Sequence, residues 1–164
     1  DNQTLSEGPP SHVINCRHAL GCDRLDHGYN MLADPDLVAR MVEDGTPFTM
    51  ACWSSILPNR IPRLERIKRM GEAGLNIVLG TDDPTMFATT IGHGWRVVFN
   101  HAGWGVAEAR KLSLAGVDAC WLPAERKAAL RADFTARLDT LAAQVDPTDR
   151  VVDLAIERAL PDRG

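Results

Sequence analysis

The chain has 164 residues, of which 45% are apolar and 24% charged, and its net charge is -4. This composition fits one folded domain or a large part of one, and it excludes a disordered chain. The mixed charge gives no basis for a nucleic-acid partner or a membrane surface, and no apolar run approaches the roughly 18 residues of a membrane span.

The four cysteines show no spacing typical of a zinc finger or a redox motif. Cys52 stands in an apolar run and is predicted to be a buried thiol. Reduced cysteines favour an intracellular, cytoplasmic protein. The first residues, DNQTLSEGPPSH, are polar and turn-rich and carry neither an initiator methionine nor a signal peptide, so we expect the C-terminal part of a longer protein.

The first predicted element is a helix that begins near Ser11, a possible N-cap, and stops at Gly21. Its apolar positions Val13, Cys16 and Leu20 would share one face. A helix of this pattern would pack that face on the core.

Three predicted strands follow, alternating with helices. The strands are CDRLDHG, ending at Gly28, then TPFTMACW, and then LNIVLGT, the clearest of the three. Between the first two, Asp34 and Pro35 are expected to cap and start a helix that runs to Gly45. Between the last two, IPRLERIKRMGEAG has the apolar spacing of another helix. This alternation indicates a parallel sheet covered by helices.

The rest of the chain, from about 90 to 145, reads as helices with no strand between them. The segments are WRVVFNHAG, GVAEARKLSLAGVDACWL and PAERKAALRADFTARLDTLAAQV. Spacing alone does not decide whether the sheet is open or closed into a barrel.

Ligands of parallel α/β folds bind at the carboxyl ends of the strands. Chemically capable residues stand at each of the three expected strand ends, so a site could converge there. These residues are Asp26-His27-Gly28, Cys52-Trp53-Ser54-Ser55 and Thr81-Asp82-Asp83-Pro84.

The adjacent carboxylates Asp82 and Asp83 have two compatible interpretations. Asp83 could cap a helix with Pro84 in its first turn, which spacing alone favours but which explains only one of the two acids. In the functional interpretation, one carboxylate meets a divalent metal and the other hydrogen-bonds a substrate, because a metal relieves the repulsion between two close anions.

His27 also has a structural and a functional interpretation. A histidine before a glycine is more often part of a turn, but the strand-end position favours a general base or an electrostatic role near neutral pH. The other histidines are expected on helix surfaces and not as zinc ligands; they are His12, His18, His93 and His101.

Taken in order, the strand ends resemble the adenosine deaminase family of zinc-dependent purine aminohydrolases. DRLDHGYNMLADPDL is similar to the family's segment with the catalytic histidine, R-[IL]-G-H-G, ACWSSILP to its C-P-[TW]-S-[NS], and LNIVLGTDDPTMF to its T-D-D-P. KLSLAGVDACWLPAERKAAL resembles the family's C-terminal helices, and the likeness runs from about Glu7 to about Ala142.

The resemblance implies an α/β fold, the C-terminal part of a (β/α)8 TIM-type barrel with extra C-terminal helices. Residues 1–164 would be the C-terminal portion of a single barrel domain. Strands six to eight would lie within about 22–82 and the C-terminal helices within about 90–145.

The resemblance further implies hydrolytic removal of the 6-amino group of adenosine, giving inosine and ammonia, by attack of a zinc-bound hydroxide at purine C6. By position, Asp82 is similar to the zinc-ligating aspartate, and Asp83 to the aspartate that hydrogen-bonds the purine. His27 is similar to the histidine that orients the attacking hydroxide. The implied cofactor is Zn²⁺, and the implied partner is a small purine.

The chain departs from the family's pattern in ways that leave alternatives open. It contains no H-x-H or H-A-G-E motif, so the three histidine ligands and the general-acid glutamate are expected upstream. Glu7 stands close to the position at which the family's glutamate would fall, but no histidine lies three residues before it. Cys52 replaces a usual proline, and Asp26 replaces the glycine before His27, as in adenine deaminases. The alternatives are therefore an adenine deaminase or other 6-aminopurine hydrolase, or a non-catalytic purine-binding relative.

Overall fold

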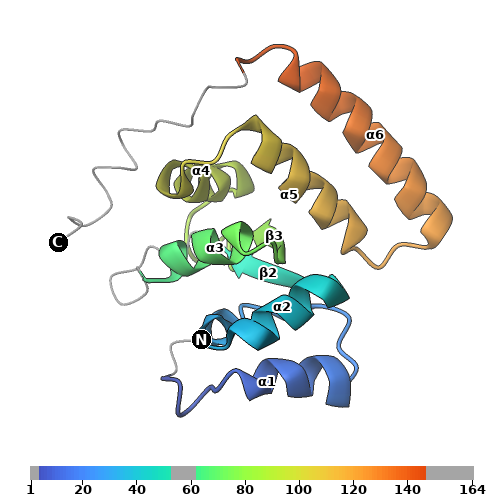
Figure 1. Cartoon of the computed structure of the whole chain (residues 1–164). Coiled ribbons are helices and arrows are strands. Elements are labelled where there is room, and N and C mark those ends of the chain that lie inside the picture. Colours follow the sequence, from blue (N-terminus) through green and yellow to red (C-terminus); the bar gives the residue numbers. More distant parts are fainter. Residues whose placement is uncertain (1–3, 53–61, 147–164) are drawn as a thin grey trace.

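The computed structural model describes residues 4–52 and 62–146, which form a mixed α/β arrangement around a parallel sheet (Figure 1). The strands β1 (Leu25–Asp26), β2 (Pro47–Ala51) and β3 (Asn76–Gly80) lie in the order β1-β2-β3, and both pairs are parallel. The predicted alternation of strands and helices is thereby confirmed, although the first strand is shorter than its sequence suggested.

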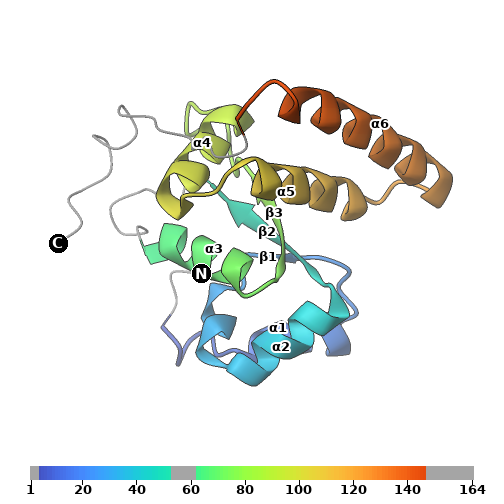
Figure 2. The same cartoon turned by 45° about the horizontal axis from the view of Figure 1, so that its top comes forward.

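Helices flank the sheet on both sides. In Figures 1 and 2, α1 and α2 lie beyond the β1 side of the sheet, while α4, α5 and α6 lie beyond the β3 side. Helix α5 contacts β3, and α6 packs on α5. The bounds are α1 Ser11–Ile14, α2 Pro35–Asp44, α3 Pro62–Glu72, α4 Ile91–Ala102, α5 Val106–Asp118 and α6 Ala124–Ala142, with a π-helical segment Asn15–Ala19 and a 3-10 helix Tyr29–Ala33.

The start of the first helix differs from the expectation. Ser11 is the first helical residue and not the N-cap, a position that Pro10 takes without a side-chain hydrogen bond. After Ile14 the helix widens into a π-helical turn, in which the Leu20 N–H donates to the Asn15 carbonyl at 2.9 Å. This wider turn rotates the later residues, so that Val13 is buried but Leu20 is 75% exposed.

The second helix follows its sequence signals closely. The Asp34 carboxylate accepts a hydrogen bond from the Leu37 N–H at 3.0 Å, and Pro35 occupies the first turn, where no amide partner is needed. Gly45 ends α2 with a φ of 64°, a left-handed conformation that glycine adopts at little cost. Local sequence therefore sets both ends of this helix.

The core lies between the sheet and its helices. Phe48 and Met50 on β2 and Ile77 on β3 are essentially inaccessible to solvent, whereas the alternate residues of both strands are half-buried. In the described part of the chain, the sheet is therefore fully covered on one face and partly covered on the other. Within residues 4–52 and 62–146, none of the helices has the length and apolar character that crossing a membrane requires.

Candidate active site

The carboxyl ends of the three strands are held side by side by backbone hydrogen bonds. The His27 N–H, just after β1, donates to the Thr49 carbonyl of β2 at 2.9 Å. The Cys52 N–H, just after β2, donates to the Gly80 carbonyl of β3 at 2.9 Å. The parallel pairing therefore brings the residues that follow β1 and β3 to the same edge of the sheet, as the sequence predicted.

His27 and Gly28 turn the chain sharply away from β1. Both have left-handed backbone conformations, with φ of 66° and 73°. A Cβ on Gly28 would lie 3.1 Å from the Phe48 ring, so glycine is needed both for the conformation and for the space. His27 has no such freedom, and its conformation costs energy that the surrounding structure offsets.

The His27 ring is half-buried and lies against Tyr29. The two ring centroids are 5.8 Å apart with 39° between the planes. Burial lowers the pKa of His27 below its ordinary value, the positive charge of Arg63 lowers it further, and the charges of Asp26 and Asp82 act in the opposite direction. The neutral imidazole is favoured, which is the form that can accept a proton.

Asp82 and Asp83 follow β3, and both side chains are exposed. Asp82 has a φ of 65°, an uncommon conformation for a residue with a side chain. The structure does not bear out the helix expected to start at Asp83 and Pro84: residues 84–88 form turns, in which the Phe87 N–H donates to the Asp83 carbonyl at 3.0 Å. The next helix, α4, is capped instead by Thr90, whose hydroxyl accepts from the His93 N–H at 3.2 Å.

At the end of β2, Cys52 is fully buried, as predicted. Burial raises the pKa of its thiol to about 12, so the group stays protonated and unreactive. The adjoining Trp53-Ser54-Ser55 segment, also expected at the site, lies outside the described residues.

Two of the remaining histidines lie in the first helical segment, and the other two lie on α4. His12 and His18 are exposed, and the His18 ring lies 3.3 Å from the Asp44 carboxylate. The His101 ring on α4 lies 3.2 Å from the Glu65 carboxylate on α3. The expectation that none of them is a zinc ligand stays a prediction.

Glu7 lies in the turn that opens the described chain. Its carboxylate accepts hydrogen bonds from the Thr4 N–H at 3.0 Å and the Thr4 hydroxyl at 2.9 Å. These bonds lower the pKa of the Glu7 carboxyl, which favours the anion. Glu7 thus supports a local turn, and a glutamate that donates a proton would need the opposite shift.

The donors present fit one ligand of a zinc ion rather than a whole site. A catalytic zinc is usually held by three protein ligands and a water. Within residues 4–52 and 62–146, no three histidine, cysteine, aspartate or glutamate side chains converge in a way that could hold a metal. Asp82, exposed at the strand end, has the chemistry of a single ligand.

Sequence reasoning did not single out Tyr29 or Arg63. Tyr29 is 1% exposed, and the Arg63 guanidinium carbon lies 5.6 Å from its ring centroid. Tyr29 lies within the DRLDHGYNMLADPDL segment, in which no pattern marks it as a functional residue. Arg63 is far from His27 in the sequence, and only the packing of α3 on the 3-10 helix brings it near.

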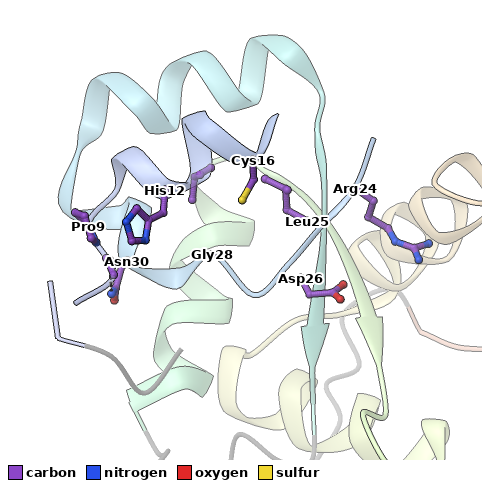
Figure 3. Close-up of a pocket in the computed structure, with 10 residues that line it drawn as sticks. Pro9, His12, Cys16, Arg24, Leu25, Asp26, Gly28 and Asn30 are labelled. Carbon is purple, nitrogen blue, oxygen red and sulfur yellow. Dashed lines mark hydrogen bonds between the residues drawn. The ribbon is translucent and has the colours of Figure 1, made fainter. Parts of the chain in front are cut away.

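A pocket of about 250 Å³ lies beside β1, away from the aspartate pair. Figure 3 shows His12 and Cys16 bordering it from the first helical segment, Asp26 from β1, and Arg24 from the residues just before β1. None of His27, Asp82 and Asp83 is among its lining residues. Since β1 pairs only with β2 among the described strands, the pocket borders an open strand edge.

Comparisons with known proteins identify relatives that match most of this chain. A family model described as adenosine deaminase matches residues 6–136. The chain is similar to adenine deaminases of Cupriavidus necator, with 33% identity over 135 residues, and of Streptomyces coelicolor, with 30% identity over 135 residues. These alignments cover 81% of this chain but only 37% and 39% of the relatives, so the chain spans well under half of their length.

Solved structures agree with this assignment. The chain superposes on a zinc-bound amidohydrolase from Burkholderia ambifaria with a TM-score of 0.76 and 33% identity, covering 84% of this chain and 39% of that one. It also superposes on an adenine deaminase from Arthrobacter aurescens with a TM-score of 0.70 and 24% identity, covering 83% and 42%. The second likeness supports the fold alone.

Proposed function

The chain belongs to the adenosine deaminase family, and from this premise we propose that its full-length protein hydrolytically removes the 6-amino group of a purine. The observation that carries the proposal is the placement of His27 and Asp82 at one edge of the sheet. Both follow strands of one parallel sheet at its carboxyl edge, and both hold left-handed backbones. Strained residues of this kind gather at functional sites.

The proposed domain is the C-terminal portion of a single (β/α)8 barrel, with β1, β2 and β3 as strands six to eight. Its support is the consecutive parallel order of these strands and the likeness to solved amidohydrolase and deaminase structures. The short alignment relative to the family members supports the view that further strands come from outside this chain.

In the proposed site, Asp82 supplies one ligand to Zn²⁺, and the remaining ligands come from outside residues 1–164. Zinc, when bound, lowers the pKa of a coordinated water to about 7 and so makes a nucleophile available near neutral pH. The bound zinc of the Burkholderia amidohydrolase supports the choice of metal.

The chain's own residues have separate roles in this proposal. His27, kept neutral by burial, accepts a proton at its imidazole and orients the attacking water. Asp83 hydrogen-bonds the purine ring, fixing which carbon faces the nucleophile. Its exposed side chain beside Asp82 at the strand end is compatible with reaching a substrate in the site.

Two substrates are supported by different features. The T-D-D-P segment and HGYNML resemble adenosine deaminases and favour adenosine. Asp26 and the similarity to adenine deaminases favour the free base adenine. Comparing kcat/KM for adenine and adenosine decides between them.

The free cysteines of the described residues are typical of a cytoplasmic protein, which is the compartment we propose.

The test uses the full-length protein, purified with zinc and assayed for ammonia release and metal content. Asp82→Ala is expected to lose both turnover and zinc, whereas Asp83→Ala is expected to keep zinc and lose turnover. Asp36→Ala, which changes an exposed aspartate on α2, is the matched control and is expected to keep both. An Asp82→Ala protein with normal turnover and zinc would refute the proposal, and purine binding without turnover by the zinc-loaded parent would identify a non-catalytic relative.

A further inference from the structure

The Tyr29 ring makes contacts with both the His27 ring and the Arg63 guanidinium. Tyr29 opens the 3-10 helix that follows the His27-Gly28 turn, and only 1% of it is exposed. Its centroid lies 5.8 Å from that of His27 and 5.6 Å from the guanidinium carbon. Both separations fall in the ranges at which aromatic pairs and cation–π pairs attract.

Within the described residues, the His27 ring lacks the kind of hydrogen bond that commonly orients a histidine with a chemical role. Such a ring is commonly oriented by a hydrogen bond at one nitrogen, which fixes the other toward the reaction. In the part of the chain that the structure describes, the buried His27 Nδ1 has no hydrogen-bond partner. The ring contact with Tyr29 is therefore a candidate for the interaction that orients this ring.

Arg63 in turn restrains Tyr29. It is 6% exposed at the beginning of α3, where a buried cation needs compensating contacts. The electron-rich face of Tyr29 supplies one such contact. The same positive charge opposes protonation of His27, which keeps the ring in the form that accepts a proton.

We propose that Tyr29, restrained by Arg63, is a positioning residue that sets the orientation of the His27 ring. The inference rests on the proposed function, because the chemical role of His27 is itself part of that proposal. Small displacements of a catalytic group are costly, since a shift of about 1 Å can lower a rate by about 100-fold. Loss of the Tyr29 ring should therefore act on the chemical step more than on substrate binding.

The first test measures kcat and KM of full-length variants. Tyr29→Leu is expected to lower kcat by about 10- to 100-fold while KM changes little. Tyr29→Phe, which keeps the ring, is expected to retain the parental kcat. Arg63→Gln is also expected to lower kcat, because Tyr29 loses the contact that restrains it. Phe99→Leu is the matched control: Phe99 is 4% exposed, packs against Trp95 and Trp104 and lies on α4, so kcat should stay unchanged.

A double-mutant cycle separates positioning from general destabilisation. In a His27→Gln background, Tyr29→Leu should cause no further fall in kcat, because there is no imidazole left to orient. A fall of the same size in both backgrounds would overturn the inference. An unchanged kcat in Tyr29→Leu with the parental histidine would overturn it as well.

A second readout does not depend on activity. In the full-length protein with ¹³C-labelled histidines, the His27 ring signals, assigned by their loss in His27→Gln, should shift strongly in Tyr29→Leu and little in Tyr29→Phe or Phe99→Leu. If the parent protein deaminates no 6-aminopurine, the proposed function fails, and the positioning inference is judged by these signals alone. Unmoved His27 signals in Tyr29→Leu would refute the inference even if the enzyme is active.

Discussion

His27 and Asp82 have nearly the same backbone conformation, with φ of 66° and 65°, and they follow the two outer strands of one three-stranded parallel sheet. Among the described non-glycine residues, only these two and Ala88 have positive φ. The left-handed conformation costs an L-residue roughly 1–2 kcal/mol. The sequence therefore accepts strain at both strand ends where the proposed chemistry requires a side chain.

This strain can be measured at Asp82 by comparing two replacements that both remove the carboxylate. Asp82→Gly should be more stable than Asp82→Ala by about 1 kcal/mol, because glycine relieves the left-handed strain, partly offset by its greater freedom when unfolded. Asp82 is exposed, so few packing contacts are lost in either variant. Urea unfolding of the full-length variants gives the difference, and equal stabilities would argue against strain at this position.

The depressed pKa of His27 predicts how stability varies with pH. The ordinary value is 6.5, and the folded protein lowers it, so the unfolded state binds more protons between the folded pKa and 6.5. The contribution of the neutral His27 to the free energy of unfolding is therefore fully present above pH 6.5, and it is lost as the pH falls through the lower pKa of the folded protein. Under the proposed mechanism, the acid limb of kcat/KM should likewise have its midpoint below 6.5.

The check is a set of urea unfolding curves at several pH values for the parent and two variants. His27→Gln should flatten the decline of stability below 6.5, since glutamine does not titrate. His27→Asn, a second replacement that does not titrate, should flatten the decline in the same way. A parental slope retained by His27→Gln would assign the pH dependence to other groups.

The sequence predicted the features that depend on neighbouring residues. The Asp34 cap, the Gly45 stop and the strands around Phe48 and Ile77 follow from local chemistry and periodicity, and the structure confirms them. The placement of His27 and Asp82 at one edge of the sheet was also predictable, because parallel strands bring their carboxyl ends to one edge.

The features that the sequence did not predict depend on contacts between distant segments or on small changes of register. Tyr29 and Arg63 meet only because α3 packs on the 3-10 helix. Leu20 is exposed because the π-helical turn rotates it away from the face of Val13. Asp83 shows the limit of local signals, since an acid followed by a proline began a turn rather than a helix.

Cys52 and Cys120 should differ in reactivity. Cys52 is fully buried with its pKa raised to about 12, whereas Cys120 is partly exposed. Because the thiolate is the reactive form, iodoacetamide at mildly alkaline pH should label Cys120 well before Cys52. Mass spectrometry of the labelled peptides gives the two rates, and urea should make them similar. Rapid labelling of Cys52 in the folded full-length protein would show that the strand end is open to solvent.

Gly71, the single glycine of α3, is predicted to be hard to replace, because Trp104 packs directly over it. A Cβ at Gly71 would lie 2.5 Å from Cζ2 and 2.7 Å from Cη2 of the Trp104 ring, which is itself buried and meets Phe99 edge-on. Gly71→Ala should therefore destabilise the protein by about 1–3 kcal/mol, as overpacked cores do.

Gly92 provides the matched control for this substitution. It lies in the first turn of α4, and a Cβ there meets nothing within 4 Å. Gly92→Ala should stabilise the protein by about 0.5–1 kcal/mol, because alanine favours the helix and restricts the unfolded chain. The two variants thus make the same chemical change with opposite expected signs in urea unfolding. Destabilisation by both would mean that glycine flexibility matters in these helices, and a neutral Gly71→Ala would mean that Trp104 moves aside at little cost.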